Sequence, residues 1–164
     1  MKVWCVRFLL VAALVLSSAP HVAAAPDEGG NPNGEVGRVV TFSSVTTQLR
    51  LLAGGCKTYT QGVRGYSLAG NHIWTYAWNS RWCYSGSRIT SLSKRRTVWA
   101  NLGWSFRRDL AESQSGGVGG SSYFHYAQGD FCLLELYTCV GHSYPWVDQT
   151  VYGSGSWKGS SGGD

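Results

Sequence analysis

The stretch that decides the fold is Ile73-Trp74-Thr75-Tyr76-Ala77-Trp78-Asn79-Ser80-Arg81-Trp82-Cys83-Tyr84. Alternate residues of a β-strand point to the same side, and a helix would scatter the same aromatic residues around its circumference. The stretch therefore predicts a β-strand with one aromatic face and one small or polar face. The aromatic face carries Trp74, Tyr76, Trp78, Trp82 and Tyr84.

This aromatic face has two interpretations. Large aromatic side chains bury about 150–250 Å² each, and a small β-sandwich needs such residues in its core. If exposed, they would form a platform on which sugar rings or bases stack, with Arg81 and Arg88 beside them. The opposite face is too poor in apolar groups to be the buried one, which favours the core and leaves residues near the strand ends as binding candidates.

Further short strands, separated by Gly, Ser and Asn, are expected on both sides of this stretch. The alternation of apolar and polar residues over Thr97–Phe106 predicts a single amphipathic strand. Regular short strands with Gly-rich turns predict an all-β fold, a single small antiparallel β-sandwich or barrel-like domain with disulfides.

The predicted β domain covers residues 39–152. Residues 1–25 have a positive start, a short apolar stretch and small residues at the cleavage site, which are the features of a secretory signal peptide. Residues 26–38 are expected to be a flexible leader, and residues 153–164 a Gly/Ser-rich tail. The mature chain is therefore expected to be secreted.

Four cysteines follow the signal peptide, and an even number in an exported chain predicts two disulfides. If the aromatic strand forms a hairpin with the strand before it, facing residue numbers sum to about 139 and Cys56 faces Cys83. The remaining pair, Cys132 and Cys139, is awkward, because residues seven apart in an extended strand lie about 23 Å apart. The two crossed arrangements therefore stay open. No Cys-x2-Cys pair indicates zinc, and no metal or cofactor is expected.

Charge is segregated along the chain. Residues 36–108 contain eleven Lys and Arg and no Asp or Glu, whereas residues 109–164 contain six acids and one Lys. Two basic clusters, Lys94-Arg95-Arg96 and Arg107-Arg108, flank the predicted strand and would lie about 33 Å apart at its ends. Such a field attracts an anionic polymer, namely teichoic acid, lipid head groups or nucleic acid. The plain alternative is a set of solvated turn residues.

Signals for catalysis are weak. Glu135 is the unusual carboxylate because it interrupts an apolar strand, where alternation predicts that it faces solvent. No spacing of nucleophile, base and orienting group is visible. The sequence favours a non-enzymatic binding or interaction protein for cell-surface or other anionic polymers. The alternatives are a small secreted hydrolase of cell-wall polymer and an antimicrobial or inhibitory protein.

Two segments resemble a group of small exported actinobacterial proteins. They are Arg81-Trp82-Cys83-Tyr84-Ser85-Gly86-Ser87-Arg88-Ile89-Thr90 and Cys139-Val140-Gly141-His142-Ser143-Tyr144-Pro145-Trp146-Val147. That group has a Trp-Cys-aromatic-x-Gly segment and a Tyr-Pro-Trp segment after the last cysteine. The resemblance covers about residues 56–152. It implies export, disulfides and a β domain, and it assigns no activity or catalytic residue.

Overall fold

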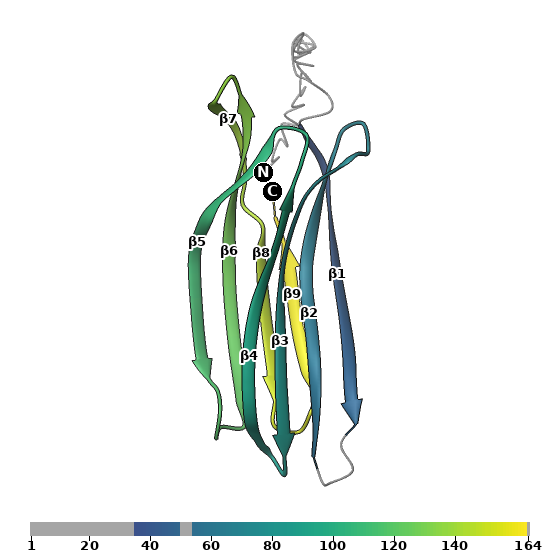
Figure 1. The fold of residues 1–164 in the computed structure, drawn as a ribbon, viewed down its shortest axis with the longest axis vertical. Helices are drawn as coiled ribbons and strands as arrows, with labels where there is room; N and C mark the ends of the chain where they lie inside the picture. Colours follow the sequence, from purple (N-terminus) through teal and green to yellow (C-terminus); the bar gives the residue numbers. More distant parts are fainter. Residues whose placement is uncertain (1–34, 50–53, 164) are drawn as a thin grey trace, which may run out of the picture.

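The computed structural model describes residues 35–49 and 54–163, and in these ranges the chain forms β-strands joined by turns (Figure 1). The strands make two antiparallel sheets. Sheet A has the order β1 (Val36–Leu49), β2 (Gly54–Ser67), β3 (His72–Ser85) and β4 (Arg88–Ala100). Sheet B has the order β5 (Trp104–Gly116), β6 (Ser122–Glu135), β8 (Trp146–Tyr152) and β9 (Trp157–Gly162), and β7 (Thr138–Ser143) pairs with β6.

The two sheets lie face to face in an elongated sandwich (Figure 1). β7 pairs with the second half of β6 and β8 with the first half. Tyr144 and Pro145 separate β7 from β8, and proline fits between strands because it has no N–H to donate to a ladder. The predicted all-β antiparallel sandwich is confirmed, and the sheets do not close into a barrel.

The core lies between the inner faces of the sheets. The alternate aromatic residues of β3 from Trp74 to Trp82 are buried, as the period of two predicted. Trp74 stacks on Phe131 of sheet B, with ring centroids 5.2 Å apart. Tyr84, at the end of β3, is partly exposed. The core interpretation therefore holds for four of the five aromatic residues.

The register of β2 and β3 places Cys56 opposite Cys83, and these residues form a disulfide. Facing residue numbers sum to 139 along the whole pairing from Gly54 to Gly65. The hairpin and its pairing could be predicted because its turn carries Gly70, with a φ of 83°, at the place that the sequence indicates.

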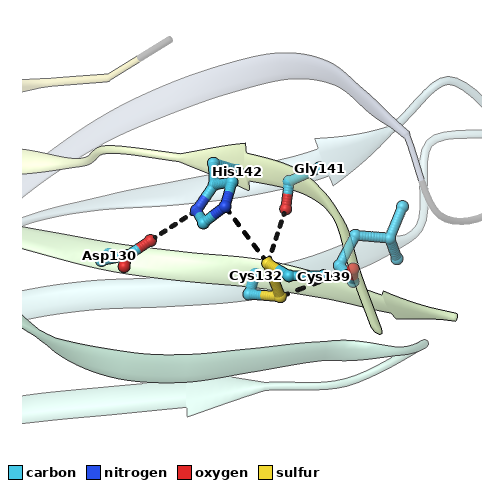
Figure 2. The surroundings of a disulfide bond; sticks show 6 residues. Asp130, Cys132, Cys139, Gly141 and His142 are labelled. Atoms are coloured by element: carbon cyan, nitrogen blue, oxygen red, sulfur yellow. Dashed lines mark hydrogen bonds and ion pairs between the residues drawn. A yellow bond between two sulfur atoms is a disulfide. The ribbon is translucent and has the colours of Figure 1, made fainter. Parts of the chain in front are cut away.

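The second disulfide joins Cys132 to Cys139 and bridges β6 and β7 (Figure 2). The chain reverses between these cysteines at Leu136 and Tyr137, whose φ angles are 46° and 70°. Two-residue hairpin turns usually contain Asn or Gly, and neither is present here. The pairing that seemed awkward is therefore the observed one, and the crossed arrangements are wrong.

The prediction of one strand over Thr97–Phe106 is also wrong. β4 ends at Ala100, the chain turns at Asn101–Gly103, and β5 begins in the other sheet. The apolar alternation continued through the turn because Leu102 occupies an apolar position of the pattern, although it is exposed and has a φ of 52°. The flanking Asn and Gly were the turn signal that this alternation obscured.

The β fold extends beyond residues 39–152. β1 begins at Val36, and β9 forms inside the segment predicted to be a tail. The Ser161 hydroxyl donates to the Gly62 carbonyl at 2.8 Å and so ties β9 to sheet A. The predicted signal peptide, and the leader up to residue 34, lie outside the described residues.

Candidate binding face

The outward face of sheet A is the candidate binding site, and we call it the A face. Residues directly opposite each other on neighbouring strands point the same way, so Thr60, Asn79 and Arg95 form one outward row. The A face consists of Arg38, Val40, Phe42, Ser44, Thr46 and Gln48 of β1, Cys56, Thr58, Thr60, Gly62, Arg64 and Tyr66 of β2, His72, Thr75, Ala77, Asn79, Arg81 and Cys83 of β3, and Ser91, Ser93, Arg95, Thr97 and Trp99 of β4.

Short polar side chains cross-link the middle of the A face. The Thr60 hydroxyl donates to Asn79 Oδ1 at 2.6 Å, and Asn79 Nδ2 donates to Thr97 Oγ1 at 3.1 Å. Arg81 reaches across β2 and donates to Gln48 Oε1 at 3.1 Å. These bonds hold the side chains in place, so the surface presents hydroxyl, amide and guanidinium groups in a fixed arrangement.

A row of stacked side chains crosses all four strands at one end of the A face. The Arg38 guanidinium lies 4.8 Å from the centre of the Tyr66 ring, and Tyr66 lies beside His72. His72 stacks on Trp99 with ring centroids 4.3 Å apart. Burial, assisted by the charge of Arg64, lowers the pKa of His72 and keeps its ring neutral near pH 7. This end therefore offers aromatic rings beside cations.

The A face carries positive charge without compensation. Arg38, Arg64, Arg81 and Arg95 point outward, and strands β1–β4 contain no Asp or Glu. Within the described residues, no carboxylate lies within ion-pair distance of these four arginines. Arg64 stacks on Phe42 at 4.3 Å, which uses the flat face of the guanidinium and leaves its N–H groups for an anion.

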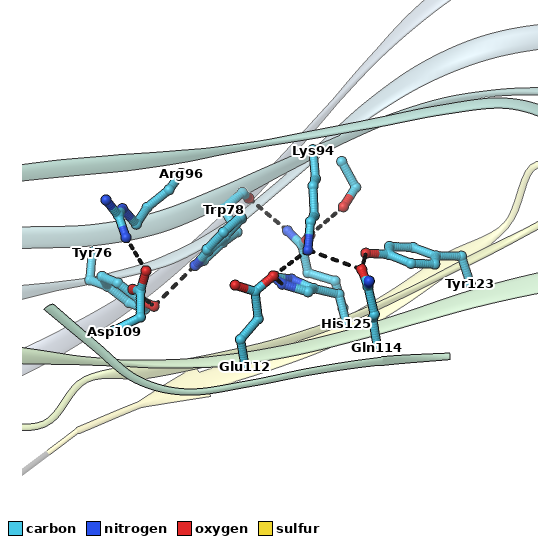
Figure 3. Close-up of polar contacts among 11 residues, drawn as sticks. Tyr76, Trp78, Lys94, Arg96, Asp109, Glu112, Gln114, Tyr123 and His125 are labelled. Atoms are coloured by element: carbon cyan, nitrogen blue, oxygen red, sulfur yellow. Dashed lines mark hydrogen bonds and ion pairs between the residues drawn. The ribbon is translucent and has the colours of Figure 1, made fainter. Parts of the chain in front are cut away.

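The five basic residues predicted to bind an anionic polymer do not share one surface. Lys94 and Arg96 point inward from β4, and they form ion pairs with Glu112 and Asp109 of β5 (Figure 3). Their charge is therefore used to join the two sheets. Arg95, between them, points outward and belongs to the A face.

The other basic cluster, Arg107 and Arg108, is exposed on β5. The expected separation of about 33 Å between the clusters is wrong, because the chain reverses at Asn101–Gly103. Asp109, the residue after Arg108, contacts Arg96 directly. The two clusters consequently lie side by side across the flank of the sandwich.

The aromatic face of β3 is not a stacking platform. Trp74, Tyr76, Trp78 and Trp82 are buried because sheet B covers this side of sheet A. Tyr84 is partly buried against the core and beside Gly155 in the turn between β8 and β9, with the Lys57 ammonium 5.7 Å from its ring centre.

A network of polar side chains closes the flank between β4 and β5 (Figure 3). His125 of β6 is fully buried, and its Nε2 lies 3.2 Å from the Glu112 carboxylate that also receives Lys94. Burial lowers the pKa of His125, and the hydrogen bond from Lys94 lowers the pKa of Glu112. The Tyr76 hydroxyl donates to Asp109 at 2.9 Å, so the network continues into the core.

We expect the protein to lose stability as the pH falls from 7 to 5. The pKa of His125 in the folded protein is below the ordinary value of about 6.5, so the unfolded chain binds the proton first. His72 acts in the same direction, and Glu112 does so at lower pH. His125→Gln should flatten the dependence of the urea midpoint on pH in this window. An unchanged slope would show that His125 does not contribute.

A third histidine, His142, lies beside the Cys132–Cys139 disulfide (Figure 2). His142 Nδ1 lies 2.9 Å from Asp130, and its Nε2 lies 3.3 Å from the Cys139 sulfur. This geometry orients a base, but the neighbouring sulfur is not a nucleophile while it is oxidised. Among the described residues, no group of three or more His, Cys, Asp or Glu is placed to hold a metal ion.

The outward face of sheet B has a different character. Phe124 and Trp146 are partly exposed there, and Asp148 lies between them on β8 with Lys158 on the neighbouring strand. Asp148 accepts hydrogen bonds from the backbone N–H and hydroxyl of Ser160, both at 2.7 Å. The mixed charge of this face makes it a poorer match for an anion than the A face.

The row formed by Tyr66, His72 and Trp99 was not predicted from the sequence. Each residue is isolated in its own segment, and the row appears only when four strands are placed in register. Because facing residue numbers of β2 and β3 sum to about 139, Tyr66 could have been placed close to His72 from the sequence. The position of Trp99 depended on the end of β4, which was misplaced.

Comparisons with known proteins add no relative. No protein-family model matches the chain, and no curated protein or solved structure matches it. The resemblance to exported actinobacterial proteins therefore rests on the two quoted segments alone. The described residues include no helix long and apolar enough to span a bilayer.

Proposed function

We propose that this chain is an exported binding protein that holds an extended anionic polymer of the cell surface across its A face. The observation that carries the proposal is the set of four outward arginines on a sheet without carboxylates. Charge-assisted hydrogen bonds from guanidinium to phosphate are among the strongest that a protein surface makes. The predicted signal peptide and the two disulfides support export.

The spacing of the arginines favours an extended ligand over a small anion. Through their register, they lie along the part of β3 between His72 and Arg81. Nine residues of a strand span about 30 Å, so no compact ion reaches all four. A polymer that runs along the strands could contact them in turn, with the hydroxyl and amide row between.

The hydrolase alternative has less support. His125 is fully buried and bonds to Glu112, and His142 lies beside an oxidised sulfur. In both cases the groups around the base are explained by packing or by the disulfide.

The proposal predicts that polymer binding depends on salt and on these four arginines. Each guanidinium–phosphate contact with a flexible polyanion contributes about 0.7 to the slope of log K against log salt. Replacing Arg38, Arg64, Arg81 and Arg95 with Gln should therefore reduce the slope by about 3. The measurement is titration of soluble poly(glycerol phosphate) teichoic acid at several salt concentrations.

The matched control replaces Arg88, Arg107 and Arg108, which are exposed but lie outside the A face. This control should bind teichoic acid with nearly the slope of the unmodified protein. If the control loses binding while the A-face variant keeps it, the A face is not the site. Binding that is insensitive to salt in all proteins would reject the electrostatic basis of the proposal.

A further inference from the structure

Three turns lie at the same end of the sandwich, uppermost in Figure 1, and we call this the loop end. Backbone hydrogen bonds join them. Leu134 N–H, next to the β6–β7 turn, donates to the Gly103 carbonyl at 2.8 Å, and Asn101 N–H donates to the Ile73 carbonyl at 2.9 Å. The turns are residues 68–71, 101–103 and 136–137.

Apolar side chains project from all three turns. Tyr137 is 100% exposed, Leu136 90%, Leu68 61% and Leu102 42%. Single exposed apolar residues are ordinary on a protein surface. Four exposed apolar residues on three turns at the same end indicate a contact surface, because water disfavours apolar side chains concentrated in one region.

Three described turns at the opposite end of the sandwich carry few apolar residues, and the connection of residues 50–53 at that end lies outside the described residues. The described turns there, residues 86–87, 117–121 and 153–156, consist of Gly and Ser apart from Val118, which is 65% exposed. Among the described residues of these turns, every positive φ belongs to a glycine. Gly and Ser are residues that turn conformations favour.

Backbone conformation adds a second, independent sign at the loop end. In the described residues, the only residues other than glycine with positive φ are Leu102, Leu136 and Tyr137. The left-handed region is unfavourable for side chains of this size, and Asn or Gly would fill these positions at lower cost. In these three residues, the backbone conformation is unfavourable and an apolar side chain is also exposed to water. Both features destabilise the fold, which points to a role outside folding.

A disulfide cross-links the β6–β7 hairpin close to its tip. Cys139 pairs with Leu134 across the hairpin, and its disulfide to Cys132 closes the hairpin a few residues below the tip. A clamped hairpin loses little conformational entropy when Leu136 and Tyr137 bind a partner, so the clamp favours binding.

The residues behind the tips match a lipid surface. Trp99 lies on β4, one residue before the end of the strand and three residues before Leu102 in the adjoining turn. It belongs to the stacked row with His72, Tyr66 and Arg38. Apolar tips, then a belt of aromatic and basic side chains, then a polar body is the layering of proteins that enter a membrane interface.

We propose that the loop end inserts its apolar tips into the headgroup region of a membrane that contains anionic lipids. Leu102, Leu136 and Tyr137 reach the acyl boundary, and Trp99 lies at headgroup level. Arg38 and its neighbour Arg64, which have no carboxylate partner in the described chain, face the lipid phosphates. This adds a second ligand to the polymer of the A face. The exposed apolar tips and their positive φ angles are separate from the observations behind the polymer proposal, whereas Arg38 and Arg64 serve both.

The test uses the variant Leu136→Asn/Tyr137→Gly, because Asn-Gly is the preferred sequence for a two-residue hairpin turn. The variant should be at least as stable as the unmodified protein. Its partition onto vesicles of equal phosphatidylglycerol and phosphatidylcholine should fall about tenfold or more, since two apolar side chains no longer leave water. Flotation of the vesicles measures the partition, and teichoic acid binding should be unchanged.

Val118→Ser is the matched control, because Val118 is an exposed apolar residue at the other end. It should bind vesicles like the unmodified protein. Failure of the unmodified protein to float with these vesicles, or equal losses in the control and the tip variant, would overturn the proposal. Binding to lipid-extracted cell envelopes that depends on Leu136 and Tyr137 would instead assign the tips to a protein pocket, and would also overturn it.

Discussion

Replacement of Trp82 by alanine is expected to lower the free energy of unfolding by about 3–5 kcal/mol. Trp82 is fully buried, and its indole N–H donates to the Tyr152 carbonyl at 3.1 Å across the two sheets. The variant therefore loses core packing and the hydrogen bond to the Tyr152 carbonyl. Urea denaturation followed by circular dichroism measures the change.

Trp99→Ala is the matched control for this prediction. Trp99 is an equally large residue on the A face, but it is 43% exposed. Its replacement should change stability by less than about 1 kcal/mol, in the range of surface substitutions. Equal losses for the two variants would contradict the assignment of the aromatic face of β3 to the core.

Removal of the Cys56–Cys83 disulfide is expected to be the second large effect. This disulfide closes a loop of 27 residues. Opening the loop increases the conformational entropy of the unfolded chain by an amount that corresponds to about 3.5 kcal/mol. The Cys132–Cys139 disulfide closes only seven residues and corresponds to about 2.4 kcal/mol. Paired Cys→Ala variants of each disulfide, compared by urea denaturation, should show the larger loss for the first.

The unmodified protein allows a test of the disulfide connectivity. In the unmodified protein, a thiol assay under denaturing, non-reducing conditions should detect no free thiol. Peptide mapping should find Cys56 joined to Cys83. A peptide that joins Cys56 to Cys132 or Cys139 would contradict the register of β2 and β3.

Local patterns made the first hairpin predictable from the sequence. The aromatic alternation of β3 and the Gly70-Asn71 turn lie close together in the chain. They fix both the strand and its register with β2, and the register brings Cys56 to Cys83.

The other two turns at the loop end, residues 101–103 and 136–137, could not be predicted in the same way. Leu102, Leu136 and Tyr137 occupy turn positions where Asn or Gly is usual, so apolar alternation appeared to continue through them. The same three residues account for the two missed turns and carry the proposed membrane contact. Residues that depart from local turn preferences are expected where a surface has a function beyond folding.

The set of residues that make up the A face could not be predicted from the sequence either. Lys94, Arg95 and Arg96 form one run in the chain, yet a strand sends alternate residues to opposite faces. Which face is outward depends on the pairing of β4 with β3. The acids that neutralise Lys94 and Arg96 come from β5, and sequence proximity gives no indication of that contact.

The central claim is that the A face binds an extended anionic polymer, and arginine side-chain NMR tests it most directly. During titration with soluble teichoic acid, the Nε–Hε signals of Arg38, Arg64, Arg81 and Arg95 should shift together, whereas those of Arg107 and Arg108 should stay in place. Shifts confined to Arg107 and Arg108, or an absence of shifts at the four outward arginines while the polymer binds, would contradict the claim.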